Sequence, residues 1–129
     1  MKKIFYILII LLLIFSCEKR DDCDPNNPSL IGTWTWIKSV GGIGGGTITA
    51  EMTGEKIVIS FSSDSVFVKT LNGNKIAESE FSISYDSRVN KSYIDYPGMI
   101  NQYFEFQDCN NLILTDIAAD GYKRYYKRK

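Results

Sequence analysis

The sequence predicts an all-β, antiparallel fold between residues 30 and 129. No stretch of this region repeats apolar residues with a helical period, and turn signals such as Asn72-Gly73 recur roughly every eight to twelve residues. Residues 75–85 alternate between apolar or small side chains and polar ones, which is typical of a strand with one buried and one solvated face. These observations favour an up-and-down barrel of eight strands, or nine if residues 47–52 form a strand of their own.

The eight expected strands account for most of the region. We expect them at residues 33–39, 56–62, 65–71, 75–85, 91–96, 101–107, 112–117 and 122–128. The glycine-rich residues 41–46 are expected to form a flexible loop, because a phosphate-binding loop would need a following helix. Closing the strands into a barrel removes exposed sheet edges. The interior of an eight-stranded barrel is either filled by side chains or holds one small ligand.

Residues 1–16 are predicted to be a signal peptide rather than part of the fold. Lys2 and Lys3 precede an apolar run over residues 4–15, which is too short for a typical membrane-spanning helix. The run ends in Leu13-Ile14-Phe15-Ser16-Cys17, which resembles the lipobox of bacterial lipoproteins. This resemblance implies that Cys17 becomes the acylated N-terminus. The alternative is an ordinary signal peptide with an incidental cysteine.

Residues 17–29 are expected to be a lipidated, flexible tether, since they combine dense charge with two prolines and no apolar period. Two acyl chains on Cys17 would hold the domain stably on a membrane. We therefore expect a lipid-anchored protein of the outer membrane, on either its periplasmic or its cell-surface face. The run Lys19-Arg20-Asp21-Asp22 resembles surface-export signals of some bacterial lipoproteins, although a solvated linker explains it equally well.

Charge and cysteine content narrow the possible partners and cofactors. Loss of residues 1–16 leaves 13 basic residues against 15 acidic ones, which does not favour nucleic acid as a partner. With Cys17 acylated, Cys23 and Cys109 remain, either as a disulfide or as two free thiols. The chain has no histidine, and two distant cysteines do not make a zinc site, so we expect no metal and no cofactor.

The domain at residues 30–129 resembles the lipocalin-like domains of small bacterial lipoproteins. The resemblance lies in Gly32-x-Trp34, in the glycine-rich loop after the first strand, in Asn72-Gly73, in Leu112-Ile113-Leu114 and in the basic, tyrosine-rich last strand. In lipocalins a basic side chain near the end of the last strand covers the motif tryptophan. The resemblance therefore implies that Arg128, or else Arg124 on the same face, lies over Trp34 as a plug of the barrel.

The expected function is non-enzymatic binding of a small apolar ligand or lipid by a monomer anchored in a membrane. Aromatic side chains of the predicted inner face could line a ligand cup, although a packed core explains them too: Trp36, Phe61, Phe67, Phe81, Tyr85, Phe104 and Phe106. No residue set indicates catalysis. The alternative is a surface protein-interaction or inhibitor module whose barrel interior is filled.

Overall fold

The computed structural model describes residues 23–129, which form one ten-stranded antiparallel sheet and a short helix. The all-β, barrel-like fold predicted from the sequence is confirmed. The strands are β1 (Gly32–Gly41), β2 (Gly46–Thr49), β3 (Ile57–Phe61), β4 (Val66–Leu71), β5 (Asn74–Glu80), β6 (Ser82–Asp86), β7 (Lys91–Asp95), β8 (Gln102–Asp108), β9 (Asn111–Asp116) and β10 (Tyr122–Arg128). The helix is α2 (Ala50–Thr53).

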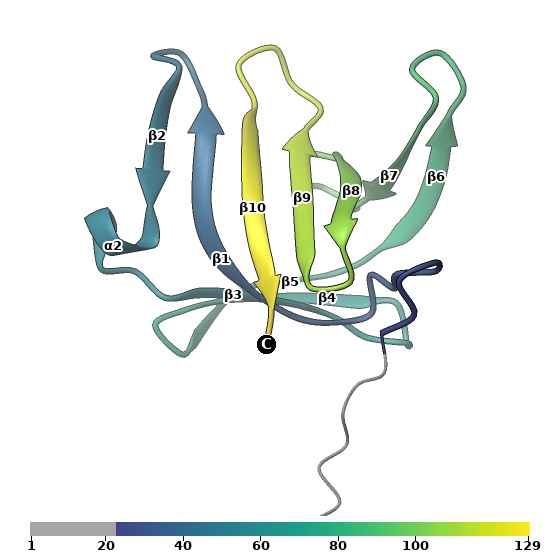
Figure 1. Ribbon diagram of the computed structural model, residues 1–129, viewed down its shortest axis with the longest axis horizontal. Coiled ribbons are helices and arrows are strands. Elements are labelled where there is room, and N and C mark those ends of the chain that lie inside the picture. The colour runs from purple at the N-terminus through teal and green to yellow at the C-terminus, as the bar shows by residue number, and fades with distance from the viewer. Residues whose placement is uncertain (1–22) are drawn as a thin grey trace, which may run out of the picture.

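Most strands that follow one another in the chain lie side by side in the sheet. The order across the sheet is β5-β4-β3-β1-β10-β9-β8-β7-β6, and β2 pairs with the second half of β1. Strand β1 lies between β3 and β10, so the first and last strands of the domain are neighbours. Their register aligns Trp34 with Arg128 and Gly41 with Tyr122. Figure 1 shows β3, β4 and β5 crossing beneath the upright β1, β10 and β9.

The sheet curls into a half-barrel because its two outer strands belong to one bent segment. Strand β5 pairs with β4 and strand β6 pairs with β7, and only Phe81 separates β5 from β6. The Phe81 amide donates to the Ser65 carbonyl at 2.9 Å, and its ring packs edge-on against Phe61. The predicted single strand over residues 75–85 is thus divided by a side chain drawn into the core. If β5 and β6 are counted as one strand, the barrel has the eight predicted strands plus β2.

The core fills the inside of the half-barrel at the end where β3, β4 and β5 cross beneath β1, β10 and β9. Phe61 lies 5.2 Å from Phe67 between ring centroids, and Phe67 lies 5.0 Å from Tyr96. The buried apolar residues of this core are Leu30, Trp34, Trp36, Ile59, Phe61, Phe67, Phe81, Ile94, Tyr96, Leu112, Leu114 and Tyr126. We call this part of the molecule the closed end.

Two connections differ from the prediction. Residues 50–53 form the helix α2 instead of continuing a strand, because the Thr49 hydroxyl accepts from the Met52 amide and Gly54 ends the helix at φ +68°. Residues 41–46 close a β1–β2 hairpin in which the Gly45 amide donates to the Gly42 carbonyl at 3.1 Å. No helix in the described part of the chain could span a membrane.

Candidate functional site

The tryptophan of the Gly-x-Trp motif is buried at the closed end beneath Arg128. Trp34 has 0% of its surface exposed, and its indole Nε1 donates to the Leu30 carbonyl at 3.0 Å. The Arg128 guanidinium lies 4.1 Å from the Trp34 ring centroid, which is a cation–π arrangement. Phe106 lies 6.1 Å from the same indole. The indole is therefore contacted by a cation and by an apolar ring.

Arg128 also ties three separate backbone carbonyls together. Its Nε donates to Cys109 at 3.1 Å, its Nη1 to Ile31 at 3.1 Å and its Nη2 to Ser29 at 2.7 Å. A Cβ at position 32 would lie 2.5 Å from Nη1, and Gly32 has φ +141°. The glycine of the motif is required because any side chain there would displace the guanidinium that covers Trp34.

The residues before β1 are fixed to the closed end by a disulfide. Cys23 and Cys109 are bonded, with an S–S distance of 2.09 Å and a Cα–Cα distance of 5.7 Å. Cys109 also supplies the carbonyl that accepts from Arg128 Nε. The second half of the predicted tether is thus held by a covalent bond and by Arg128. Cys17, with the predicted signal peptide, lies outside the described residues.

Arg124, the other residue expected to cover Trp34, points into the opposite half of the molecule. It forms an ion pair with Asp116, and its guanidinium lies 5.4 Å from the Tyr122 ring centroid. Because Arg124 is four residues before Arg128 on β10, it shares the inner face of the strand but not its position along the barrel. Arg124 therefore lies in the half of the barrel away from the closed end.

The predicted cup-lining residues divide into three groups. Phe61, Phe67 and Phe81 are buried against one another, and Phe104 and Phe106 pack against the same core, so these five fill the closed end instead of lining a cup. Trp36 borders a pocket with one edge. Tyr85 is 59% exposed and lies beside a different pocket near the β6–β7 hairpin.

Above the core, the concave face of the sheet carries two adjoining pockets of about 260 and 310 Å³. We call them together the concave cleft. Lys69, Arg124 and Tyr126 border both pockets. Apolar walls complete each one: Trp36, Ile48 and Ile57 in the first pocket, and Met99 and Ile100 in the second. Apolar walls around a few convergent polar groups are typical of small-molecule sites.

Asp116 is the centre of a hydrogen-bonded network in the floor of the concave cleft. Its side chain is 8% exposed and accepts from Arg124, from Gln102 Nε2 at 2.7 Å and from the Tyr122 amide at 3.1 Å. The Tyr96 hydroxyl donates to Gln102 Oε1 at 3.2 Å. Burial opposes ionisation of Asp116, but the hydrogen bonds from Arg124 and Gln102 outweigh it and hold the pKa of the carboxyl below its usual value.

Lys69 is the second cation of the concave cleft. It lies on the inner face of β4, paired with Ile59 on one side and Ala77 on the other. Burial and the nearby Arg124 guanidinium lower the pKa of Lys69, against the opposing effects of Asp116 and Glu55. None of the four salt bridges within residues 23–129 involves its ammonium group.

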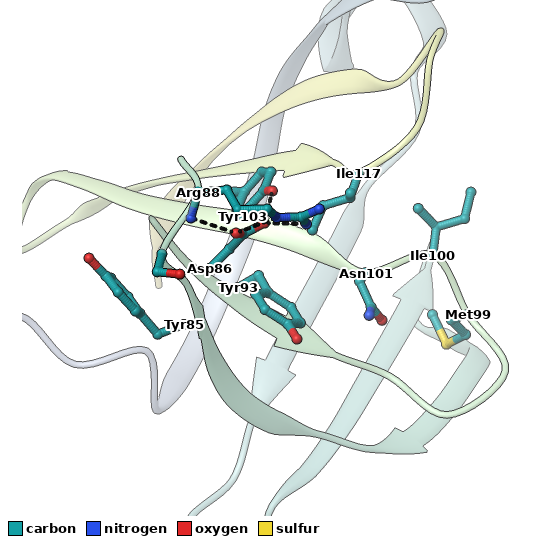
Figure 2. Close-up of a pocket in the computed structure, with 10 residues that line it drawn as sticks. Tyr85, Asp86, Arg88, Tyr93, Met99, Ile100, Asn101, Tyr103 and Ile117 are labelled. Carbon is teal, nitrogen blue, oxygen red and sulfur yellow. Dashed lines mark hydrogen bonds and ion pairs between the residues drawn. The ribbon is translucent and has the colours of Figure 1, made fainter. Parts of the chain in front are cut away.

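Another pocket, of about 650 Å³, lies beside the β6–β7 hairpin (Figure 2). Asp86 accepts from Arg88 Nη2 at 2.9 Å and from the Tyr103 hydroxyl at 3.0 Å. The bonds from Arg88 and Tyr103 lower the pKa of Asp86 to about 2. Arg88 and Asp86 thus satisfy each other's charge, whereas Lys69 in the concave cleft has no salt-bridge partner among residues 23–129. The concave cleft is the better candidate site.

Within residues 23–129, no group of three or more His, Cys, Asp or Glu side chains is placed to hold a metal ion. Comparisons with protein-family models, with curated proteins and with solved structures return no match to this chain.

Sequence reasoning did not identify Lys69, Gln102 or Asp116 as site residues. A signal was present at Lys69, which shares a strand face with Phe67 and Leu71 and so is a charge at a position expected to be buried. Asp116 lies in the predicted strand 112–117, directly after the apolar residues 112–114. That strand was expected to be buried on both faces, so a carboxylate in a binding site was not expected there.

Proposed function

We propose that this protein is a non-enzymatic, membrane-anchored lipocalin-like lipoprotein that binds a small, largely apolar ligand in its concave cleft. The observation that carries the proposal is the pair of adjoining pockets over the core, each with an apolar wall and each bordered by Lys69, Arg124 and Tyr126. The closed end supplies the rigid support, because its aromatic core and the Arg128 plug hold β1 and β10 together. Pre-formed sites of this kind bind without large reorganisation of the protein.

Binding is tested with the mature domain and a neutral, environment-sensitive dye such as Nile red. Saturable binding, and its loss on Ile48→Glu, are expected because Ile48 borders the first pocket and a carboxylate there would lie against the apolar part of the dye. Ile43→Glu is the matched control, since Ile43 is 93% exposed at the tip of the β1–β2 hairpin. The absence of saturable binding, or equal loss in both variants, would overturn the proposal.

The membrane anchor is proposed to be lipid on Cys17, in the outer membrane. It is supported by the lipobox-like residues 13–17 and by the absence of the usual small-x-small cleavage site after the apolar run. Cells grown with a palmitate analogue should label the wild-type protein, and Cys17→Ser should lose both the label and the membrane fraction. A Cys17→Ser protein that still labels would refute lipidation at this residue.

The second candidate function is a protein-interaction or inhibitor module. One observation favours it: apolar side chains around the β6–β7 hairpin and the following loop are exposed, among them Ile83, Tyr85 and Ile100. Exposed apolar clusters often mark protein contacts. Capture of a defined surface protein that is lost on Ile83→Asp, in a protein that binds no small molecule, would favour this function over the first.

A further inference from the structure

The two cations of the concave cleft are unequally matched by carboxylates. Asp116 uses Oδ1 for Arg124 and Gln102 and Oδ2 for the Tyr122 amide, so three donors from the protein already bind its carboxylate. Lys69 borders both pockets but forms no salt bridge with any residue between 23 and 129. Glu55 is the other carboxylate at the cleft, and it lies exposed at the edge of the first pocket.

A half-buried cation without a partner is unfavourable unless something in the site compensates for it. Lys69 stands among apolar neighbours, because its inner-face neighbours across the sheet are Ile59 and Ala77. Lys69 and Arg124 equal the two carboxylates of the cleft in number, but the Lys69 ammonium has no salt-bridge partner among residues 23–129 and lies over an apolar floor. A surface of this composition is complementary to a molecule with an apolar body and one negative group.

We propose that Lys69 and Arg124 bind the anionic head group of an amphipathic ligand, whose apolar chain lies against Trp36 and Ile57. This inference rests on the proposed binding function and specifies its ligand class. The position of Lys69 between the two pockets allows the head group to lie at their junction, where Tyr126 borders both. Arg124 keeps its bond to Asp116, and the head group adds the counter-charge that Lys69 lacks.

The test compares three eight-carbon probes that differ only in the head group: octanoate, octyl phosphate and octanol. Calorimetry on the mature domain should show that one of the two anions binds at least roughly tenfold more tightly than the alcohol, since a charge-assisted hydrogen bond contributes about 1.5–3 kcal/mol. The stronger anion identifies the head group as carboxylate or phosphate. Equal binding of all three would overturn the anionic head group while leaving the proposed function intact, whereas no binding of any probe would overturn both.

Lys69→Met separates a head-group role from a structural one. The substitution should lower the preference for the anion over octanol roughly tenfold, and Lys69→Arg should restore most of that preference. Lys75→Met is the matched control, because Lys75 lies on the neighbouring strand β5, is exposed and borders neither pocket. The head-group role of Lys69 would be refuted if Lys75→Met lost anion binding to the same extent as Lys69→Met. It would also be refuted if Lys69→Met bound the anion normally.

Discussion

Arg128→Met removes the cation that covers Trp34 while keeping an unbranched side chain over the indole. The substitution loses the cation–π contact, which contributes about 0.5–2 kcal/mol, and the partly buried hydrogen bond to the Cys109 carbonyl, which contributes about 1.5–3 kcal/mol. The two bonds to Ser29 and Ile31 are exposed and add little. We expect the free energy of unfolding to fall by about 2–5 kcal/mol.

The assay is urea unfolding of the mature domain, followed by tryptophan fluorescence. Trp34 is fully buried and Trp36 nearly so, and both report on the β1–β10 contact. Lys127→Met is the matched control, because Lys127 precedes Arg128 on β10 but is exposed on the outer face. The free energy of unfolding of Arg128→Lys should lie between those of Arg128→Met and Lys127→Met. An ammonium keeps the charge but cannot reach three carbonyls at once.

The reasoning fails if Arg128→Met and Lys127→Met unfold at the same urea concentration. It also fails if Arg128→Lys is as stable as the wild type, because the three-carbonyl arrangement would then contribute nothing measurable. We expect Arg128→Met to lower the urea concentration at the unfolding midpoint and to leave unchanged the slope of the unfolding free energy against urea concentration. An unchanged slope indicates that stability is lost without a change in the surface exposed on unfolding.

Three further predictions concern the disulfide and two titrating groups. Replacing Cys23 and Cys109 by serine should lower the free energy of unfolding by roughly 4–5 kcal/mol in the chain-entropy description, measured by urea unfolding; a loss below about 1 kcal/mol would contradict it. Burial raises the pKa of Tyr126 from 10.0 to about 12, so the stability it contributes is complete below pH 10 and is lost as the pH rises through 12; Tyr126→Phe should remove this part of the alkaline loss in thermal melts. Burial lowers the pKa of Lys69, which Arg124, Asp116 and Glu55 face, so anion binding should weaken as Lys69 loses its proton at a pH below its usual pKa of 10.5; Lys69→Arg should abolish this weakening in calorimetry at rising pH.

The strand pattern was predictable because each strand has its own local alternation and its own turn residues. Asn72-Gly73 separates β4 from β5, and residues 75–85 show the alternation of an antiparallel strand. The division of the predicted strand 75–85 at Phe81 was not predictable, because that bend depends on a contact with Phe61 from another strand. Helix α2 is only one turn long, which is too short for any apolar period to indicate it.

The candidate site was less predictable than the fold for a similar reason. Its polar residues lie on strands β4, β8, β9 and β10, and no motif in the sequence spaces them together: Lys69, Gln102, Asp116 and Arg124. Only the closed curvature of the sheet brings these positions to one surface. By contrast, Arg128 could be associated with Trp34, because antiparallel pairing of the first and last strands sets the end of one beside the start of the other.

The disulfide and the proposed lipid together set the orientation of the cleft. Cys23 is bonded to the closed end, so only residues 18–22 separate that end from an acyl chain on Cys17, a reach of at most about 20 Å. Arg128 lies at the closed end, and the cleft residues of β10 precede it along the strand: Tyr122, Arg124 and Tyr126. In Figure 1 the β1–β2 and β9–β10 connections lie at the opposite end of the sheet from the C-terminus.

We therefore expect the closed end to face the membrane and the cleft to open away from it. In vesicles carrying the lipidated protein, a fluorophore at position 110 should be quenched by a bilayer acceptor more strongly than one at position 44. The two positions test opposite ends of the same sheet, since Asn110 adjoins the disulfide and Gly44 lies in the β1–β2 turn. Equal quenching would show that the disulfide does not orient the domain, and a ligand could then enter the cleft directly from the bilayer.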